Sequence, residues 1–367
     1  MGLLKFDKLP FNTLVGADTK TFRQVMQGTV IDKEYRGKFR LTKFCRSILQ
    51  LFYRKNTKCY ERMEKKPIKE PVFIIGHWRS GTTFVHNVIS CDPQFGYCTT
   101  YQTVFPHLML YASRFFKWCA SVLMPSTRPT DSLELSVEQP QEEEFALANM
   151  THMSFYHFWL FPRRFAEWRE KALLLQSASR EEYDEFCQTT RKMISISLHC
   201  QQKERFLSKN PPHTARVKAL LETYPDAKFI HIVRNPYTVF ESTRNFFTNT
   251  IRPLQLQNIS PEELEQEILT TYTALHDKYE AEKGLIPEGN LIEIRFEDFE
   301  ADPMGVTEQI YSKLKLGSFD EAKQYMGRYV NSKRGFRKNK YDYDSRTIDL
   351  VNSHWGYAVE QWNYEKL

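Results

Sequence analysis

The sequence predicts an α/β fold, in which helices cover both faces of a parallel β-sheet and helical insertions interrupt the alternation. Apolar runs of strand length are each followed by a turn and then by a segment of helical periodicity. This order recurs without an internal repeat, first from Val72 and then over residues 206–224, 228–243 and 290–315. Strands and helices that alternate in this way form parallel sheets, and ligands bind outside the carboxyl ends of the strands.

The first unit contains a phosphate-binding loop in the stretch PVFIIGHWRSGTTFVHNVIS (71–90). Its apolar run meets Gly76, four residues follow, and Gly81 then precedes a helix. The spacing Gly-x4-Gly-x-Thr is that of the Walker A loop, whose backbone N–H groups hold phosphate oxygens. Thr82 stands where the Walker lysine would be, and Arg79 lies in the middle of the loop. The sequence therefore predicts a P-loop-type sheet with an altered phosphate loop.

Two later units place cations at the ends of strands. The strand 206–209 ends in Lys209 and is followed by two prolines, whereas the strand 228–233 is closed by Arg234. Because the carboxyl ends of parallel strands meet at one edge of a sheet, we expect Arg79, Lys209 and Arg234 to converge there.

Length and composition predict one large core. The 367 residues are 41% hydrophobic and 14% aromatic, so one or two domains are expected. We expect a basic, mainly helical N-terminal extension (1–69) packed on a main domain (70–367). The seven cysteines form no C-x-x-C pair, which favours a reducing compartment over a disulfide framework or a zinc cage. Without a signal peptide or a run of membrane-spanning length, a cytoplasmic location is expected.

The segment 36–69 is strongly basic. It holds twelve Lys/Arg against two Glu, and its apolar residues recur at near-helical spacing. The favoured interpretation is the solvated face of a helix packed on the main domain. Docking on an anionic membrane is the alternative, which would make the protein peripheral to the membrane. Nucleic acid is disfavoured, because the segment has no recognised nucleic-acid-binding motif.

Together, GHWRSGTT and FIHIVRNPYTVFES resemble the paired signatures of sulfotransferases that use 3′-phosphoadenosine 5′-phosphosulfate (PAPS). A third element, LSKNPPHT, is similar to the strand-end lysine of tyrosylprotein and bacterial members, here Lys209. The resemblance runs from about Pro71 to Phe299. It implies a 3′-phosphate site at Arg234 and Ser242, and a 5′-phosphosulfate loop made of Arg79, Ser80, Gly81, Thr82 and Thr83.

A weaker match lies near the C-terminus, where NSKRGFRKNKY resembles the basic loop that closes over the 3′-phosphate. The resemblance implies that Arg334, Arg337 and Lys338 also contact the nucleotide. A solvated run of charge is the alternative.

The resemblance also explains the missing lysine. A Walker lysine serves β- and γ-phosphates beside Mg²⁺, whereas PAPS transfers its sulfonate in line, without a metal, and leaves 3′-phosphoadenosine 5′-phosphate (PAP). Arg79 can hold a pair of sulfonate oxygens through its planar fork, and Lys209 can stabilise charge on the leaving oxygen.

The general base is expected in the cluster EQPQEEEFALANM, which resembles an element of bacterial sulfotransferases. Glu142 and Glu144 are the candidates to accept the hydroxyl proton. Alternatively, these glutamates are simply favourable residues for a first helical turn. His213 is a competing base, or it orients the lysine loop. The glutamate that tyrosylprotein sulfotransferases place shortly after the loop helix is missing, because GYCTTYQTVFP holds no acidic residue.

Acceptor preference depends on two aromatic segments, 104–124 and 151–168, for which helical insertions are expected. Ordinary core packing is the favoured interpretation. If one of them covers the acceptor site, an apolar alcohol (lipid, sterol-like or phenolic) fits better than a glycan or peptide hydroxyl. Two other classes remain as alternatives, a P-loop kinase or ATPase, which should carry the Walker lysine, and a non-catalytic nucleotide-binding membrane adaptor.

Overall fold

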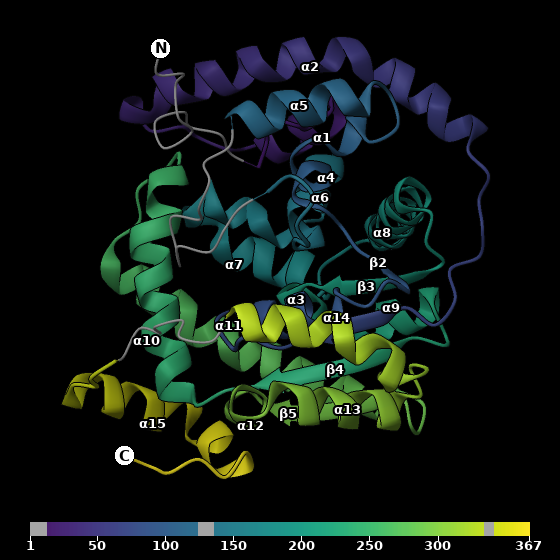
Figure 1. Cartoon of the computed structure of the whole chain (residues 1–367). Coiled ribbons are helices and arrows are strands. Elements are labelled where there is room, and N and C mark those ends of the chain that lie inside the picture. The colour runs from purple at the N-terminus through teal and green to yellow at the C-terminus, as the bar shows by residue number, and fades with distance from the viewer. Residues whose placement is uncertain (1–12, 124–135, 334–340) are drawn as a thin grey trace. The chain divides into compact units, whose positions relative to one another are not determined.

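The computed structural model describes residues 13–123, 136–333 and 341–367 (Figure 1). Two compact units, each assembled from three stretches of sequence, make up the chain. Unit 1 comprises residues 1–67, 97–203 and 246–264, and unit 2 comprises residues 68–96, 204–245 and 265–367. The division into an extension (1–69) and a main domain (70–367) stays a prediction.

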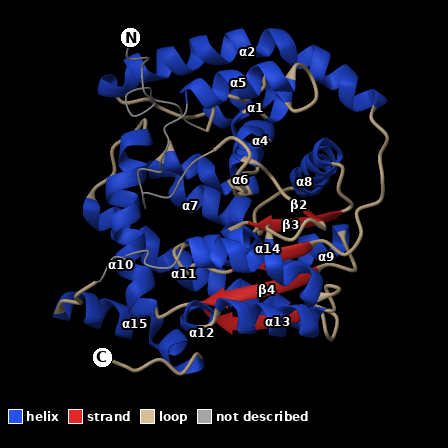
Figure 2. Cartoon of the chain, in the orientation of Figure 1, coloured by secondary structure: helices blue, strands red, loops and turns tan. Residues whose placement is uncertain are grey.

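Unit 2 is built on a five-stranded sheet of order β2-β3-β1-β4-β5 (Figure 2). All neighbouring strands are parallel, so the predicted α/β fold is confirmed. The strands are β1 (Val72–Ile75), β2 (Phe95–Gly96), β3 (Arg205–Lys209), β4 (Lys228–Val233) and β5 (Leu291–Arg295).

The central strands are buried on both faces. Every residue of β1 and β4 is buried, which is typical of parallel strands covered on both sides. One face packs on α3 (Thr82–Ile89), α12 (Phe296–Ala301), α13 (Pro303–Leu314) and α14 (Phe319–Ser332). On the other face, Phe73 and Phe229 stack at 5.6 Å, and His231 lies against Tyr279 of α11 (Pro261–Glu282).

The C-terminal helix α15 (Ser345–Gln361) packs on the same unit through Trp355. The indole of Trp355 stacks on Tyr272 at 3.9 Å and meets Phe240 of α10 (Pro236–Phe246) edge-on at 5.5 Å. Its N–H donates to the carbonyl oxygen of Leu269 at 3.1 Å, so the buried ring is also satisfied as a donor.

The described part of unit 1 is mainly helical, as expected for insertions. Its helices are α1 (Thr19–Met26), α2 (Arg36–Arg62), α4 (Thr100–Val104), α5 (Ser113–Leu123), α6 (Glu143–Met150), α7 (Phe165–Trp168) and α8 (Arg180–Gln201). The basic segment forms α2, which ends before Pro67. None of the helices in the described ranges is both long and apolar enough to cross a membrane.

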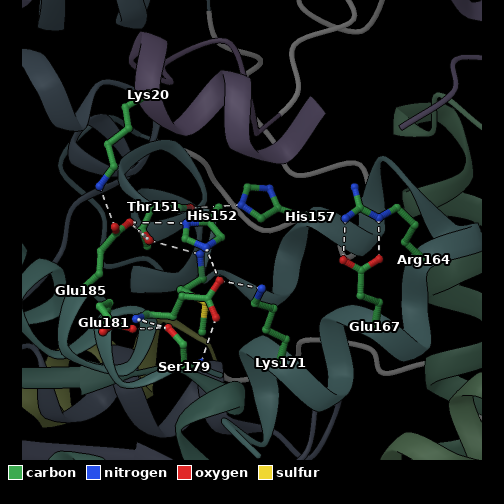
Figure 3. A network of polar contacts seen from close by, with 12 residues as sticks. Lys20, Thr151, His152, His157, Arg164, Glu167, Lys171, Ser179, Glu181 and Glu185 are labelled. Atoms are coloured by element: carbon green, nitrogen blue, oxygen red, sulfur yellow. Dashed lines mark hydrogen bonds and ion pairs between the residues drawn. The ribbon is translucent and has the colours of Figure 1, made fainter. Parts of the chain in front are cut away.

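A polar network inside unit 1 fixes α8 (Figure 3). His152 lies between two carboxylates of α8, with Nε2 3.1 Å from Glu182 and Nδ1 3.5 Å from Glu185. Lys171 pairs with Glu182 and Lys20 pairs with Glu185, both at 2.6 Å. Burial alone would lower the pKa of His152, but the hydrogen bonds that its ring donates to the carboxylates of Glu185 and Glu182 outweigh burial and raise that pKa. The network ties α1 and the turn at residues 151–153 to one helix.

Candidate active site

The phosphate loop begins where β1 and β4 approach closely. Gly76 has φ 139°, and a Cβ at this position would lie 2.3 Å from the carbonyl oxygen of Ile232. Only glycine fits there. The N–H of Gly76 donates to the hydroxyl of Thr214 at 2.7 Å, which joins the loop to the segment that follows β3.

A second glycine ends the loop and begins α3. Gly81 has φ 87°, and a Cβ there would lie 2.0 Å from the ring of Phe296, the first residue of α12. The loop can pack this closely on Phe296 only because Gly81 has no side chain. Thr82 opens the helix and is buried, and Ser80, whose N–H donates to the carbonyl oxygen of His77, is also buried.

Arg79 adopts a left-handed backbone conformation, with φ 68°. This region is unfavourable for a residue with a Cβ, and such conformations concentrate at functional sites. The side-chain Nε donates to Ser242 Oγ at 2.9 Å, and the carbonyl oxygen of Arg79 accepts from Arg234 Nη1 at 2.9 Å. The loop arginine therefore contacts both residues expected to hold a 3′-phosphate.

Arg234 follows β4, and its guanidinium lies over the ring of Phe296 at 4.7 Å. Burial lowers the pKa of Arg234 below its usual value, although Glu297 and Glu300 act in the opposite direction. A partly buried guanidinium is costly unless an anion or a polar group compensates it. This environment suits a phosphate contact.

Lys209 closes β3 on the other side of β1. Lys209 lies opposite Ile74 of β1 in the sheet, and its side chain is buried. The ammonium donates to Thr83 Oγ1, in the first turn of α3, at 3.3 Å. Since β3 and β4 flank β1, the three expected cations lie at one edge of the sheet. We call Arg79, Lys209, Arg234 and Ser242 the donor edge.

His213 is fully buried in the turn after β3. Its Nε2 lies 3.3 Å from the side-chain amide nitrogen Nδ2 of Asn210, and its ring meets that of Phe73 edge-on at 5.8 Å. The backbone N–H of Asn210 donates to the carbonyl oxygen of Ile74 at 3.3 Å. These contacts favour the orienting role considered for His213 over the role of base.

The two candidate glutamates occupy different environments in unit 1. Glu144 is fully buried, and its Oε1 accepts from Ser154 Oγ at 2.9 Å and from the N–H of Phe155 at 2.7 Å. Glu142 occupies the N-cap position of α6, is only partly buried, and accepts a short hydrogen bond from the hydroxyl of Tyr156. Glu144 thus holds a turn, whereas Glu142 is the more accessible carboxylate.

Aromatic side chains surround Tyr156. Its ring stacks on Trp159 at 4.4 Å, and Phe145 meets both rings edge-on at 4.9 and 5.1 Å. Phe246 meets Trp159 edge-on at 5.7 Å. Phe145 and Phe246 stay partly exposed, whereas Tyr156 and Trp159 are buried. We call Phe145, Tyr156, Trp159 and Phe246 the aromatic group; it offers an apolar surface beside Glu142.

The basic C-terminal segment is only partly covered by the structure. Lys333 caps α14, and its ammonium lies 5.6 Å from the centre of the Tyr329 ring. Arg334, Arg337 and Lys338 lie outside the described residues. Across the part of the chain that is described, no cluster of His, Cys, Asp and Glu is arranged to hold a metal ion.

Sequence reasoning missed several residues of these sites. Phe296 gives no local signal, because it meets Gly81 only after the chain has folded. Thr214 lies within the quoted lysine element LSKNPPHT, but the hydrogen bond that it accepts from Gly76 joins the segments after two different strands, β3 and β1. Tyr156 lies in segment 151–168, for which the sequence indicates only an aromatic composition, and nothing in the sequence predicts its contact with Glu142.

Comparisons with known proteins identify relatives over most of the chain. A family model described as "Sulfotransferase family" matches residues 71–321. The chain is 31% identical over 296 residues to the omega-hydroxy-beta-dihydromenaquinone-9 sulfotransferase Stf3 of Mycobacterium bovis, and equally to that of Mycobacterium tuberculosis. The match covers 81% of this chain and 76% of the relative.

Solved structures show a similar fold. The sulfotransferase STF1 of Mycobacterium tuberculosis aligns with a TM-score of 0.65 and 18% identity, covering 94% of this chain and 100% of that one. The sulfotransferase STF9 of Mycobacterium avium also aligns with a TM-score of 0.65, at 16% identity, covering 95% of this chain and 97% of that one.

Proposed function

Because this chain belongs to the sulfotransferase family, we propose that it transfers a sulfonate group from PAPS to the hydroxyl of an apolar alcohol, by direct in-line transfer without a metal. Family membership makes it a transferase. The observation that carries the choice of donor is the donor edge, where Arg79 contacts both Ser242 and Arg234. These are the residues that the sequence motifs assign to the two ends of PAPS.

The residues of the donor edge fit PAPS in charge and position. Arg234 and Ser242 would hold the 3′-phosphate, and the partly buried guanidinium of Arg234 gains most from such an anion. The N–H groups of Gly81, Thr82 and Thr83 at the start of α3 would hold the 5′-phosphate, because a helix N-terminus offers free donors and a favourable dipole. We assign Ser80 to the same loop.

Lys209 and Arg79 are proposed to stabilise charge during transfer. PAPS supplies an activated sulfonate on a phosphate leaving group. The ammonium of Lys209 donates to Thr83 in the first turn of α3, where the 5′-phosphate is proposed to bind, and this contact supports a role at that end of PAPS. Fixed positive charge near an oxygen that becomes more negative lowers the barrier without reorganisation. Arg79 would present its planar fork to sulfonate oxygens.

Glu142 is the favoured general base. Glu144 already accepts two hydrogen bonds from the turn at Ser154 and Phe155, so its carboxylate serves the fold. Glu142 is partly exposed and contacts the aromatic group through Tyr156. A base must reach the proton that it removes, which favours the accessible carboxylate. His213 is assigned to orienting the segment around Asn210.

The aromatic group supports an apolar alcohol as acceptor. Flat apolar surface with few polar groups binds hydrocarbon rings and chains better than a glycan, which needs more hydrogen-bonding side chains. The Mycobacterium relative is named for a menaquinone-derived acceptor, which belongs to this class. A glycan or peptide hydroxyl is the alternative acceptor.

We also propose a cytoplasmic location with peripheral membrane contact, and no role for nucleic acid. Seven free cysteines support a reducing compartment. A hydrophobic acceptor would partition into a bilayer, so contact with the membrane surface would bring the enzyme to it.

The test is turnover of PAPS with pools of long-chain alcohols, phenols and sugars, followed by mass spectrometry of the products. Sulfated apolar alcohols are expected. Sulfation of sugars alone would overturn the acceptor class. In parallel, PAP should raise the melting temperature of the protein, because a ligand specific for the native state stabilises it. Stabilisation by ATP with Mg²⁺, and none by PAP, would overturn the choice of donor.

A further inference from the structure

The exposed apolar side chains of this protein are concentrated on two helices of unit 1. Across the described ranges, eleven large apolar side chains are exposed, and seven of them lie on α2 and α5. They are Leu41, Phe44, Ile48 and Leu51 on α2, and Phe115, Trp118 and Val122 on α5. Scattered apolar residues are normal on a surface, but a concentration of this kind marks an interaction site.

Each set forms a row along its helix. The residues on α2 are separated by three, four and three positions, and those on α5 by three and four, so each set lies on one helical face. Leu51 is 74% exposed, Phe44 64% and Trp118 62%, which are very high values for side chains of this size. Within the described residues of unit 1 (13–67, 97–123, 136–203 and 246–264), nothing covers these rows.

The two helices pack against each other, so their rows belong to one region of the unit (Figure 1). Phe52 of α2 meets Phe116 of α5 edge-on at 5.4 Å. Asn56 of α2 accepts hydrogen bonds from the N–H groups of Leu110 and Tyr111, just before α5, at 2.8 and 3.1 Å. The opposite face of α5 is buried, with Phe116 and Ala120 in a small core with Tyr53.

Cations flank the apolar row of α2. The helix carries nine Lys/Arg and a single Glu. Arg40, Arg54 and Lys58 are exposed and share one helical face, directly beside the row that contains Leu41 and Leu51. An apolar row bordered by cations is the pattern of helices that lie in the interface of an anionic bilayer.

We propose that the apolar rows of α2 and α5, with the cations of α2, form a docking surface for an anionic lipid membrane. The apolar side chains would enter the headgroup region, and the aromatic Phe115 and Trp118 suit that depth. A second copy of this chain is disfavoured as the occupant, because two α2 helices would bring like charges together. The inference rests on the proposed peripheral location, but not on the proposed chemistry.

The experiment is co-sedimentation of the full chain with vesicles, in the absence of PAPS and acceptor. Vesicles of phosphatidylcholine and phosphatidylglycerol in equal parts are compared with vesicles of phosphatidylcholine alone. The wild type should bind the mixed vesicles more tightly, and added salt should weaken that binding. Equal binding to both vesicles, or to neither, would overturn the proposal.

Variants locate the surface. Phe44→Gln with Leu51→Gln should lower the partition coefficient on mixed vesicles by at least about tenfold, and Phe115→Gln with Trp118→Gln should lower it similarly. The matched control, Val30→Gln with Leu285→Gln, changes exposed apolar residues elsewhere and should bind like the wild type. Wild-type binding by both double variants would overturn the proposal, and wild-type binding by the α5 pair alone would remove α5 from it.

A dimer would be a different occupant of the same surface. Analytical ultracentrifugation should show that the wild type forms no dimer through this surface. A dimer of that kind would be present in the wild type and would dissociate in the double variant Phe44→Gln with Leu51→Gln. Such a dimer would overturn the membrane assignment. Since none of these measurements depends on turnover, a failure here would leave the sulfotransferase proposal intact.

Discussion

The donor edge is built from the ends of neighbouring strands, whereas the aromatic group depends on how short helical segments pack. Lys209 is the last residue of its strand, Arg79 and Arg234 each follow a strand within a few residues, and the order of the sheet alone brings these strands together. Glu142 meets Tyr156 only because a buried turn folds back on α6. The first region is therefore fixed by topology, and the second can change its shape by changes in local packing.

The largest effect is expected at Lys209. Lys209→Ala should lower kcat by about 30- to 1,000-fold, because removing fixed positive charge from a leaving oxygen costs about 2–4 kcal/mol. The dissociation constant of PAP should change much less. Lys218→Ala, which removes an exposed lysine from the same unit, is the matched control. Steady-state kinetics and PAP binding check this, and unchanged turnover in Lys209→Ala would remove the residue from the mechanism.

The second prediction separates the two glutamates. Glu142→Ala should lower kcat about a hundredfold with little change in melting temperature, since a general base contributes about 10²–10⁴-fold. Glu144→Ala should mainly lower the melting temperature by several degrees, because the buried N–H of Phe155 loses the side-chain acceptor at a cost of about 1–3 kcal/mol, whereas Ser154 Oγ keeps the carbonyl oxygen of residue 144.

The measurements are kcat and thermal denaturation of both variants. The reverse pattern, with Glu144→Ala stable but inactive and Glu142→Ala active, would assign the base to Glu144.

A third, smaller effect is expected at the 3′-phosphate contact. Arg234→Ala should raise the dissociation constant of PAP about ten- to a hundredfold, since a hydrogen bond to a charged group contributes about 1.5–3 kcal/mol. The turnover rate at saturating PAPS should fall by a smaller factor than the affinity for PAP, because the 3′-phosphate does not react. Calorimetry of PAP binding checks the first part. An equal loss of kcat and of kcat/KM would place Arg234 in the transfer step instead.

The smallest effect concerns the pH dependence of stability. The raised pKa of His152 contributes stability that is fully present below its unfolded value of about 6.5 and is lost as the pH rises through the folded value. The pKa of Glu185 falls to about 2, chiefly through His152, and its contribution is present above about pH 4.5 and lost on acidification.

The network should therefore stabilise most between about pH 4.5 and 6.5. His152→Gln should lower the melting temperature more at about pH 5.5 than at about pH 8.5. His354→Gln, at an exposed position, serves as the control. A loss of stability in His152→Gln that does not vary with pH would mean that His152 acts only by packing.

The difference between the two regions also explains what the sequence could predict. Strands β1, β3, β4 and β5, both loop glycines and the cations at strand ends follow from local patterns, because each strand-turn-helix unit contains its own signals. The two-residue strand β2 was not predicted. Phe296 lies beneath Gly81 from far along the chain, and no pattern within either segment records the contact. The role of Glu144 was equally hidden, because it depends on a turn ten residues away. Segment 104–124 was expected in the core or over the acceptor, yet α5 buries Phe116 and exposes Trp118.

The close contact between Gly81 and Phe296 limits which residues of this enzyme can be varied. Any side chain there would collide with Phe296, so mutant libraries that vary this residue would consist mostly of unfolded or misassembled loops. Gly76 imposes the same restriction on the other end of the loop. Libraries intended to test the proposed acceptor surface should keep both glycines constant and diversify the partly exposed Phe145 and Phe246 instead. The phosphate loop would then stay constant while the proposed acceptor surface varies.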